Sequence, residues 1–103
     1  MIIRQGDVLV FQSDVPAHAV PVERENGRII LAHGEVTGHA HAILERDVEL
    51  LSVSDQADRW LRVGAGGATI QHEEHGAHVL APGTYQVRIQ REYSPAEIRR
   101  VVD

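Results

Sequence analysis

Two short histidine clusters hold the residue types of this chain that are best suited to metal chemistry. The first is Gly38-His39-Ala40-His41, followed by Glu45. Side chains alternate between the faces of a β-strand and the backbone rises ~3.3 Å per residue, so His39 and His41 would share one face about 7 Å apart. Glu45 has the same parity and would lie on that face too. Two imidazoles so placed can converge on one ion at ~2.1 Å per bond.

The second cluster is the segment His72-Glu73-Glu74-His75-Gly76-Ala77-His78. In a strand, His72 and Glu74 share a face, and His78 joins them if the strand stays regular. A turn or bulge at Gly76 would bring in His75 instead. Because the two clusters hold five of the seven histidines, we predict that they meet at one metal site. The candidate ligands are His39, His41, His72, His75 and His78.

The residue types also indicate which metal and which chemistry to expect. Neutral imidazole suits Zn, Fe, Ni, Co or Cu, whereas Mg and Ca prefer more oxygen ligands. If the site is catalytic, the metal would act as a Lewis acid or activate water or dioxygen, and the base would be Glu45, Glu73 or Glu74. The segment from His72 to His75 is not a zinc-protease motif, because that motif needs histidines at positions i and i+4 of a helix.

The same histidines also fit other interpretations. They could be exposed polar residues at strand ends, or buried residues hydrogen-bonded to the backbone. The opposite face of the first cluster's strand, formed by Ala40, Ala42 and Leu44, is the more core-like of the two. If that face packs on the core, the histidines line a groove, a subunit interface or solvent.

Two motifs resemble those of a known family. His39-x-His41-x-x-x-Glu45 is similar to the first cupin motif, and Gly76, five residues, then Pro82 and Gly83 resemble part of the second. The resemblance covers roughly residues 34–83 and implies a metal held inside a small β-barrel, with no particular reaction. Because no histidine follows Gly83, the usual fourth ligand would come from the second cluster. Residues 34–41 and 90–95 also look like those of small uncharacterised bacterial proteins, which implies no activity.

The elements that would position the histidines are short strands separated by turn signals. Asn26-Gly27 suits a type I′ hairpin because both positions need φ > 0, and Tyr85 to Ile89 show the period-two alternation of a half-buried strand. Spacing of this kind predicts a single all-β domain over residues 1–103, a small cupin-like barrel or sandwich. The expected strands are 7–11, 20–25, 28–31, 37–45, 48–53, 59–63, 68–72 and 85–89.

The end of the chain predicts one short C-terminal helix. Ser94 can cap it, Pro95 suits its first position and Glu97 completes a capping box. On such a helix Ile98, Val101 and Val102 would share a face, which must dock on the domain's own sheet or on another subunit. We therefore predict a homo-oligomer.

Composition narrows the class of partner. The net charge of −5 and the aromatic content of 4% argue against a nucleic-acid partner, since such proteins concentrate Lys and Arg into a patch. No apolar stretch approaches the ~20 residues of a membrane span. Cysteine is absent, which excludes disulfides and thiolate ligands and favours a cytoplasmic location.

These observations predict a metal-binding β-rich protein with a histidine-cluster site and a small molecule as its further partner. Whether it is an enzyme is open, and no nucleophile elbow is present around its serines. The alternative is a non-catalytic ligand-binding or accessory module whose histidines are structural.

Overall fold

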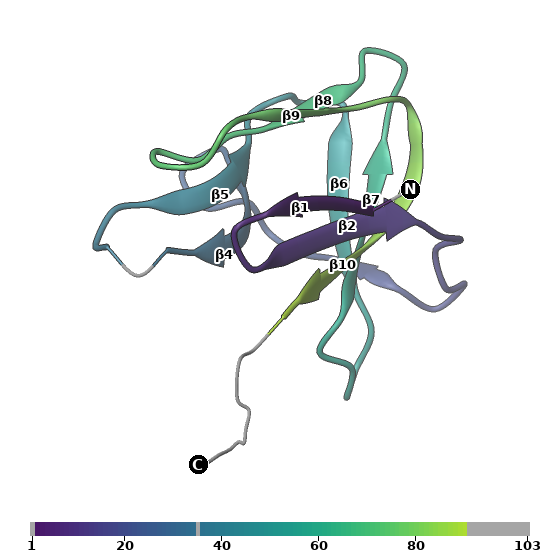
Figure 1. Ribbon diagram of the computed structural model, residues 1–103. Coiled ribbons are helices and arrows are strands. Elements are labelled where there is room, and N and C mark those ends of the chain that lie inside the picture. Colours follow the sequence, from purple (N-terminus) through teal and green to yellow (C-terminus); the bar gives the residue numbers. More distant parts are fainter. Residues whose placement is uncertain (1, 35, 91–103) are drawn as a thin grey trace.

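A computed structural model describes residues 2–34 and 36–90, and these form ten β-strands and no helix (Figure 1). All strand pairs are antiparallel. The predicted all-β class is therefore confirmed for the described part of the chain. The strands are β1 (Ile2–Gln5), β2 (Val8–Gln12), β3 (Val20–Pro21), β4 (Ile29–His33), β5 (Ala40–Ile43), β6 (Val48–Ser52), β7 (Arg59–Val63), β8 (Ala68–Ile70), β9 (His78–Leu80) and β10 (Gly83–Ile89).

The strands form one large sheet and two small ladders. The large sheet has the order β1-β2-β10-β7-β6-β3, and the ladders are β4-β5 and β8-β9. Ala42 and Gln71 link the two ladders, because each backbone N–H donates to the other's carbonyl at 2.9 and 2.8 Å. The sheets do not close into a barrel, so the described residues do not form the closed barrel that was one of our two predicted alternatives.

The main core lies between the large sheet and the ladders, since both contribute side chains to it. Strand β10 shows the predicted alternation, with Tyr85 and Val87 buried and Arg88 exposed. The buried members of this core are Val8, Val10, Ile29, Leu31, Ile43, Val48, Leu50, Leu61, Val63, Ala68, Ile70, Leu80, Tyr85 and Val87.

Strand β5 turns its histidine face, rather than its alanine face, toward the main core. Ile43 is fully buried in that core and His41 is 3% exposed, whereas Leu44 is half exposed. Ala40 and Ala42 belong to a separate small cluster. The alternative in which the alanine face packs on the main core is therefore not the one observed. Burying Ile43 removes more apolar surface from water than burying an alanine, which favours the observed orientation.

The predicted turn at Asn26-Gly27 is confirmed, but the strand before it pairs elsewhere. Both residues have positive φ, 53° and 80°, and Glu25 and Arg28 exchange backbone hydrogen bonds across the turn. The preceding strand β3 is only two residues long and pairs with β6 instead of β4. Pro21 has no N–H to donate, so β3 could not pair fully with a strand on each side. This suits its position at the edge of the large sheet.

The predicted C-terminal helix lies outside the described residues. The apolar stripe that motivated the homo-oligomer lies there too, so both stay predictions. Within residues 2–34 and 36–90, no helix is long and apolar enough to cross a membrane.

Truncating adjacent residues of β5 tests which face packs on the core. Ile43→Ala should lower the free energy of unfolding by about 2–4 kcal/mol, because a fully buried isoleucine leaves a cavity. Leu44→Ala should cost well under about 1 kcal/mol, because half of its side chain is already in water. Urea unfolding followed by the fluorescence of the buried Trp60 measures both values. Equal losses, or a larger loss for Leu44→Ala, would contradict this orientation.

Candidate functional site

The site is organised around the side-chain amide of Gln5, the last residue of β1. Gln5 is 1% exposed, and its Nε2 donates to the carbonyls of Ile70 at 3.1 Å and Gly76 at 2.8 Å. A carboxamide has both of its donors on nitrogen, while its oxygen only accepts. The two carbonyls therefore fix the amide's orientation and leave Oε1 as an acceptor.

That oxygen fixes the protonation pattern of His41. His41 Nδ1 lies 2.7 Å from Gln5 Oε1, so Nδ1 carries the proton and donates it. In the neutral ring the lone pair is then on Nε2. Burial, followed by the nearby His72, lowers the pKa of His41 below its ordinary value, which favours the neutral ring at pH 7. His41 Nε2 lies 3.9 Å from Asp7 Oδ1.

Three further histidines lie in the same cluster, two of them next to His41. The ring centres of His72 and His75 lie 4.3 and 6.0 Å from that of His41 and 4.7 Å from each other. His39 lies 6.1 Å from His72. Four of the five predicted ligands are therefore neighbours, and they come from both clusters as predicted.

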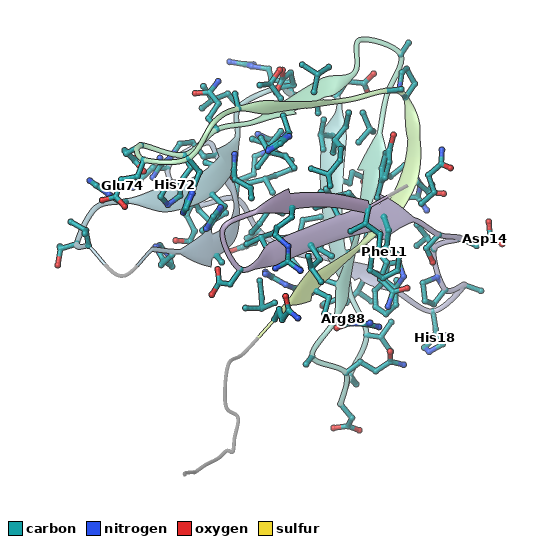
Figure 2. The ribbon with its side chains drawn as sticks, viewed as in Figure 1. Phe11, Asp14, His18, His72, Glu74 and Arg88 are labelled. Carbon is teal, nitrogen blue, oxygen red and sulfur yellow. The ribbon has the colours of Figure 1, made fainter. Side chains whose placement is uncertain are left out.

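Backbone contacts hold the second cluster against β5. Beyond the Ala42–Gln71 bridge, Glu73 Oε1 accepts a hydrogen bond of 2.9 Å from the backbone N–H of Ala40. This bond is the main reason that the pKa of Glu73 is lowered. Glu74 Oε2 lies 3.1 Å from His39 Nδ1, without the angle of a hydrogen bond. Figure 2 shows Glu74 beside His72 at one end of the molecule, far from His18 at the other.

His72 differs from His41 in the role of its Nδ1 atom, which accepts hydrogen bonds instead of donating one. Its Nδ1 accepts hydrogen bonds from the backbone N–H groups of Glu74 at 3.0 Å and His75 at 3.3 Å. A neutral His72 therefore carries its proton on Nε2, which is directed toward Gly34. In this orientation His72 closes the turn from 72 to 75 and offers a donor instead of a lone pair.

A glycine in the β1–β2 turn leaves room for the other two rings. Gly6 has φ of +59°, and a Cβ there would lie 2.9 Å from His75 Nε2 and 3.3 Å from His41 Cε1. His75 Nε2, the ring of His41 and the neighbouring Asp7 thus meet around the backbone of this turn. Among the described residues, however, no three His, Asp or Glu side chains are already set as a metal site.

A domain family of unknown function, DUF8820, matches residues 4–90 of the chain. The chain belongs to this family. The matched span contains Gln5, the β1–β2 turn and both histidine clusters. No curated protein and no solved structure matched the chain.

Two predicted residues of this DUF8820 chain lie away from the gathered rings. Glu45 follows the end of β5; its carbonyl accepts a hydrogen bond from Arg24, and its buried Oε1 makes no hydrogen bond with the described residues. His78 lies in β9 opposite Ile70 and is not among the histidines whose rings contact one another. The roles of these two residues, as base and as ligand, stay predictions.

Sequence reasoning missed Gln5, Gly6 and Asp7. A signal for the turn was present, because Gly-Asp between two apolar runs is typical of a two-residue hairpin. Only Gly6 of the pair has positive φ, as in a type II′ turn. Nothing local marks Gln5 as buried, since its partners Ile70 and His41 are distant along the chain.

The lowered pKa of His41 predicts acid sensitivity of the metal-free domain. The unfolded chain takes up a proton at this residue near pH 6.5, whereas the folded chain does so only at lower pH. The contribution of His41 is therefore present above about pH 6.5 and is lost as pH falls through the folded pKa. In chelator, His41→Gln should show a shallower loss of unfolding free energy between pH 7 and pH 5 than wild type. Parallel curves from urea titrations of the two proteins would contradict the assignment.

Proposed function

We propose that this DUF8820 domain binds one divalent transition metal ion, Zn, Fe, Ni, Co or Cu, at the histidine cluster beside the β1–β2 turn. The observation that carries the proposal is the bond between His41 Nδ1 and Gln5. A histidine that ligates a metal generally donates its other N–H to a fixed acceptor, which orients the ring and sets the tautomer. Gln5, held by two carbonyls, is such an acceptor.

The spacing of the side chains fits one ion. Two imidazoles on a tetrahedral ion at ~2.1 Å would have ring centres about 5 Å apart, and the centres of the His41 and His75 rings lie 6.0 Å apart. Two donor atoms on such an ion would be roughly 3.4 Å apart, compared with 3.9 Å between His41 Nε2 and Asp7 Oδ1. The residues that would hold the metal are His41 and His75, with Asp7 beside His41 and His39 next to His72.

The carboxylates differ in how well they could serve a reaction. A bound metal would supply Lewis acidity or activate water or dioxygen. Glu73 is a weak candidate for the base, because the Ala40 N–H occupies one oxygen and lowers its pKa. Glu74 lies beside His39, and no backbone N–H of the described residues donates to its carboxylate. If the domain is an enzyme, Glu74 is therefore the better placed of these two.

The alternative is that the histidine cluster has a structural role and only holds loops together. The hydrogen bonds of His72 support this alternative. His72 Nδ1 already accepts two backbone N–H groups of its own turn, which is a structural task. In that case the domain would be a ligand-binding or accessory module. Metal binding by the remaining histidines separates the two functions.

Metal titration of untagged protein at pH 7.5 tests the proposal. We expect one equivalent of Zn, Ni, Co, Fe or Cu to bind, and His41→Ala to lose most of it. Because His41 is buried, His75→Ala is the cleaner variant: His75 is exposed, so its loss should weaken binding at least about tenfold without unfolding the domain. His18→Ala, far from the cluster, should bind as wild type does (Figure 2).

A matched pair of glycine variants separates the site from general stability. Gly6 and Gly27 both have positive φ, so alanine at either costs roughly 1 kcal/mol of backbone strain. Only at Gly6 does the new Cβ crowd histidines; at Gly27 nothing lies within 4 Å. Gly6→Ala should therefore weaken metal binding, and Gly27→Ala should not. If the wild-type protein binds no metal, the proposed function is refuted. If Gly6→Ala, Gly27→Ala and His75→Ala all bind metal as tightly as wild type does, the metal site is not at this cluster.

A further inference from the structure

The outer face of β5 carries a hollow that the proposed metal site does not use. Its volume is about 310 Å³, at the lower end of the range for small-molecule sites. Ala40 and Ala42 of β5 line it together with Leu44, which follows the strand, and Gln71 and His72 line it on the adjoining segment. Ala40 and Ala42 are 3% and 5% exposed, so the half-exposed Leu44 supplies most of the apolar surface that a ligand could reach.

The two remaining lining residues, Arg28 and Glu73, carry opposite charges and lie at opposite ends. Arg28 precedes Ile29, which pairs with Ile43, so Arg28 lies at the Leu44 end. Glu73 accepts from Ala40 N–H, at the other end. Leu44 lies four positions after Ala40, which is roughly 13 Å along an extended chain.

Of these two charged side chains, only Glu73 makes a hydrogen bond or ion pair with the described residues. Glu73 is held by the Ala40 N–H. None of the ion pairs among the described residues involves Arg28. A guanidinium beside an apolar hollow is a specific partner for a carboxylate, because its fork of N–H donors matches the two oxygens.

We propose that this hollow binds a small monocarboxylate with an apolar body. The carboxylate would pair with Arg28, and the apolar body would lie against Leu44 and over the small exposed parts of Ala40 and Ala42. The negative charge of Glu73 at the far end disfavours a second carboxylate there. This site is separate from the proposed metal site and does not depend on it.

The experiment uses the full chain in chelator, so that no metal contributes. Hexanoate, adipate and hexanamide are each titrated while the backbone amides of Ala40, Ala42 and Gln71 are followed by NMR. Hexanoate should give saturable shifts at these three amides. Hexanamide and adipate should bind roughly tenfold more weakly or worse, because one lacks the charge that pairs with Arg28 and the other meets Glu73.

Two variants complete the test. Arg28→Gln should weaken hexanoate binding about tenfold. Arg62→Gln, on the large sheet and paired with Glu49, is the matched control and should leave it unchanged. No saturable shift with hexanoate, equal binding of the three probes, or equal binding by Arg28→Gln would each overturn the proposal. Zinc binding without hexanoate binding would refute only the carboxylate site. Hexanoate binding without zinc binding would refute only the proposed function.

Discussion

The site depends on one buried carboxamide that joins three distant parts of the chain. Gln5 at the end of β1 donates to Ile70 and Gly76 and accepts from His41 on β5. Each of these groups is costly to leave unsatisfied away from water. The β1–β2 turn, β5 and the segment after β8 are therefore held together by the same side chain that sets the tautomer of His41.

The other contacts of the second cluster extend the same arrangement. The Ala42–Gln71 bridge joins the two ladders, and Glu73 fastens the following turn to the start of β5. His72 closes that turn with its own Nδ1. These bonds place the ring of His75 over Gly6, where only a glycine leaves room. The exposed His75 is thus brought beside the buried His41.

Local patterns predicted much of the fold. The strand at 59–63 was predicted to the residue, and the Asn26-Gly27 turn follows from the positive φ that it requires. The partner of β3 could not be predicted, because strand pairing depends on tertiary contacts rather than on local propensity. The same limit applied to β5. The alternation of its side chains defined two faces, but it did not predict which face packs on the main core.

The site divides in the same way. Residue type and density predicted that the two histidine clusters would meet, and four of the five rings do. The role of Gln5 was beyond sequence reasoning, since a polar residue in a short strand is ordinarily exposed and its partners are 36 to 71 positions away. Asp7 was missed with it, although the Gly-Asp pair signalled the turn.

The most direct test of this account is the tautomer of His41 in the metal-free domain at pH 7.5. A long-range ¹H–¹⁵N correlation spectrum of the histidine rings distinguishes a protonated nitrogen from one with a lone pair. We predict that His41 is neutral, with its proton on Nδ1 and its lone pair on Nε2. A proton on Nε2 alone would contradict this, because Nδ1 could then not donate to Gln5. A charged ring would contradict it too, because neither nitrogen would have a lone pair for a metal.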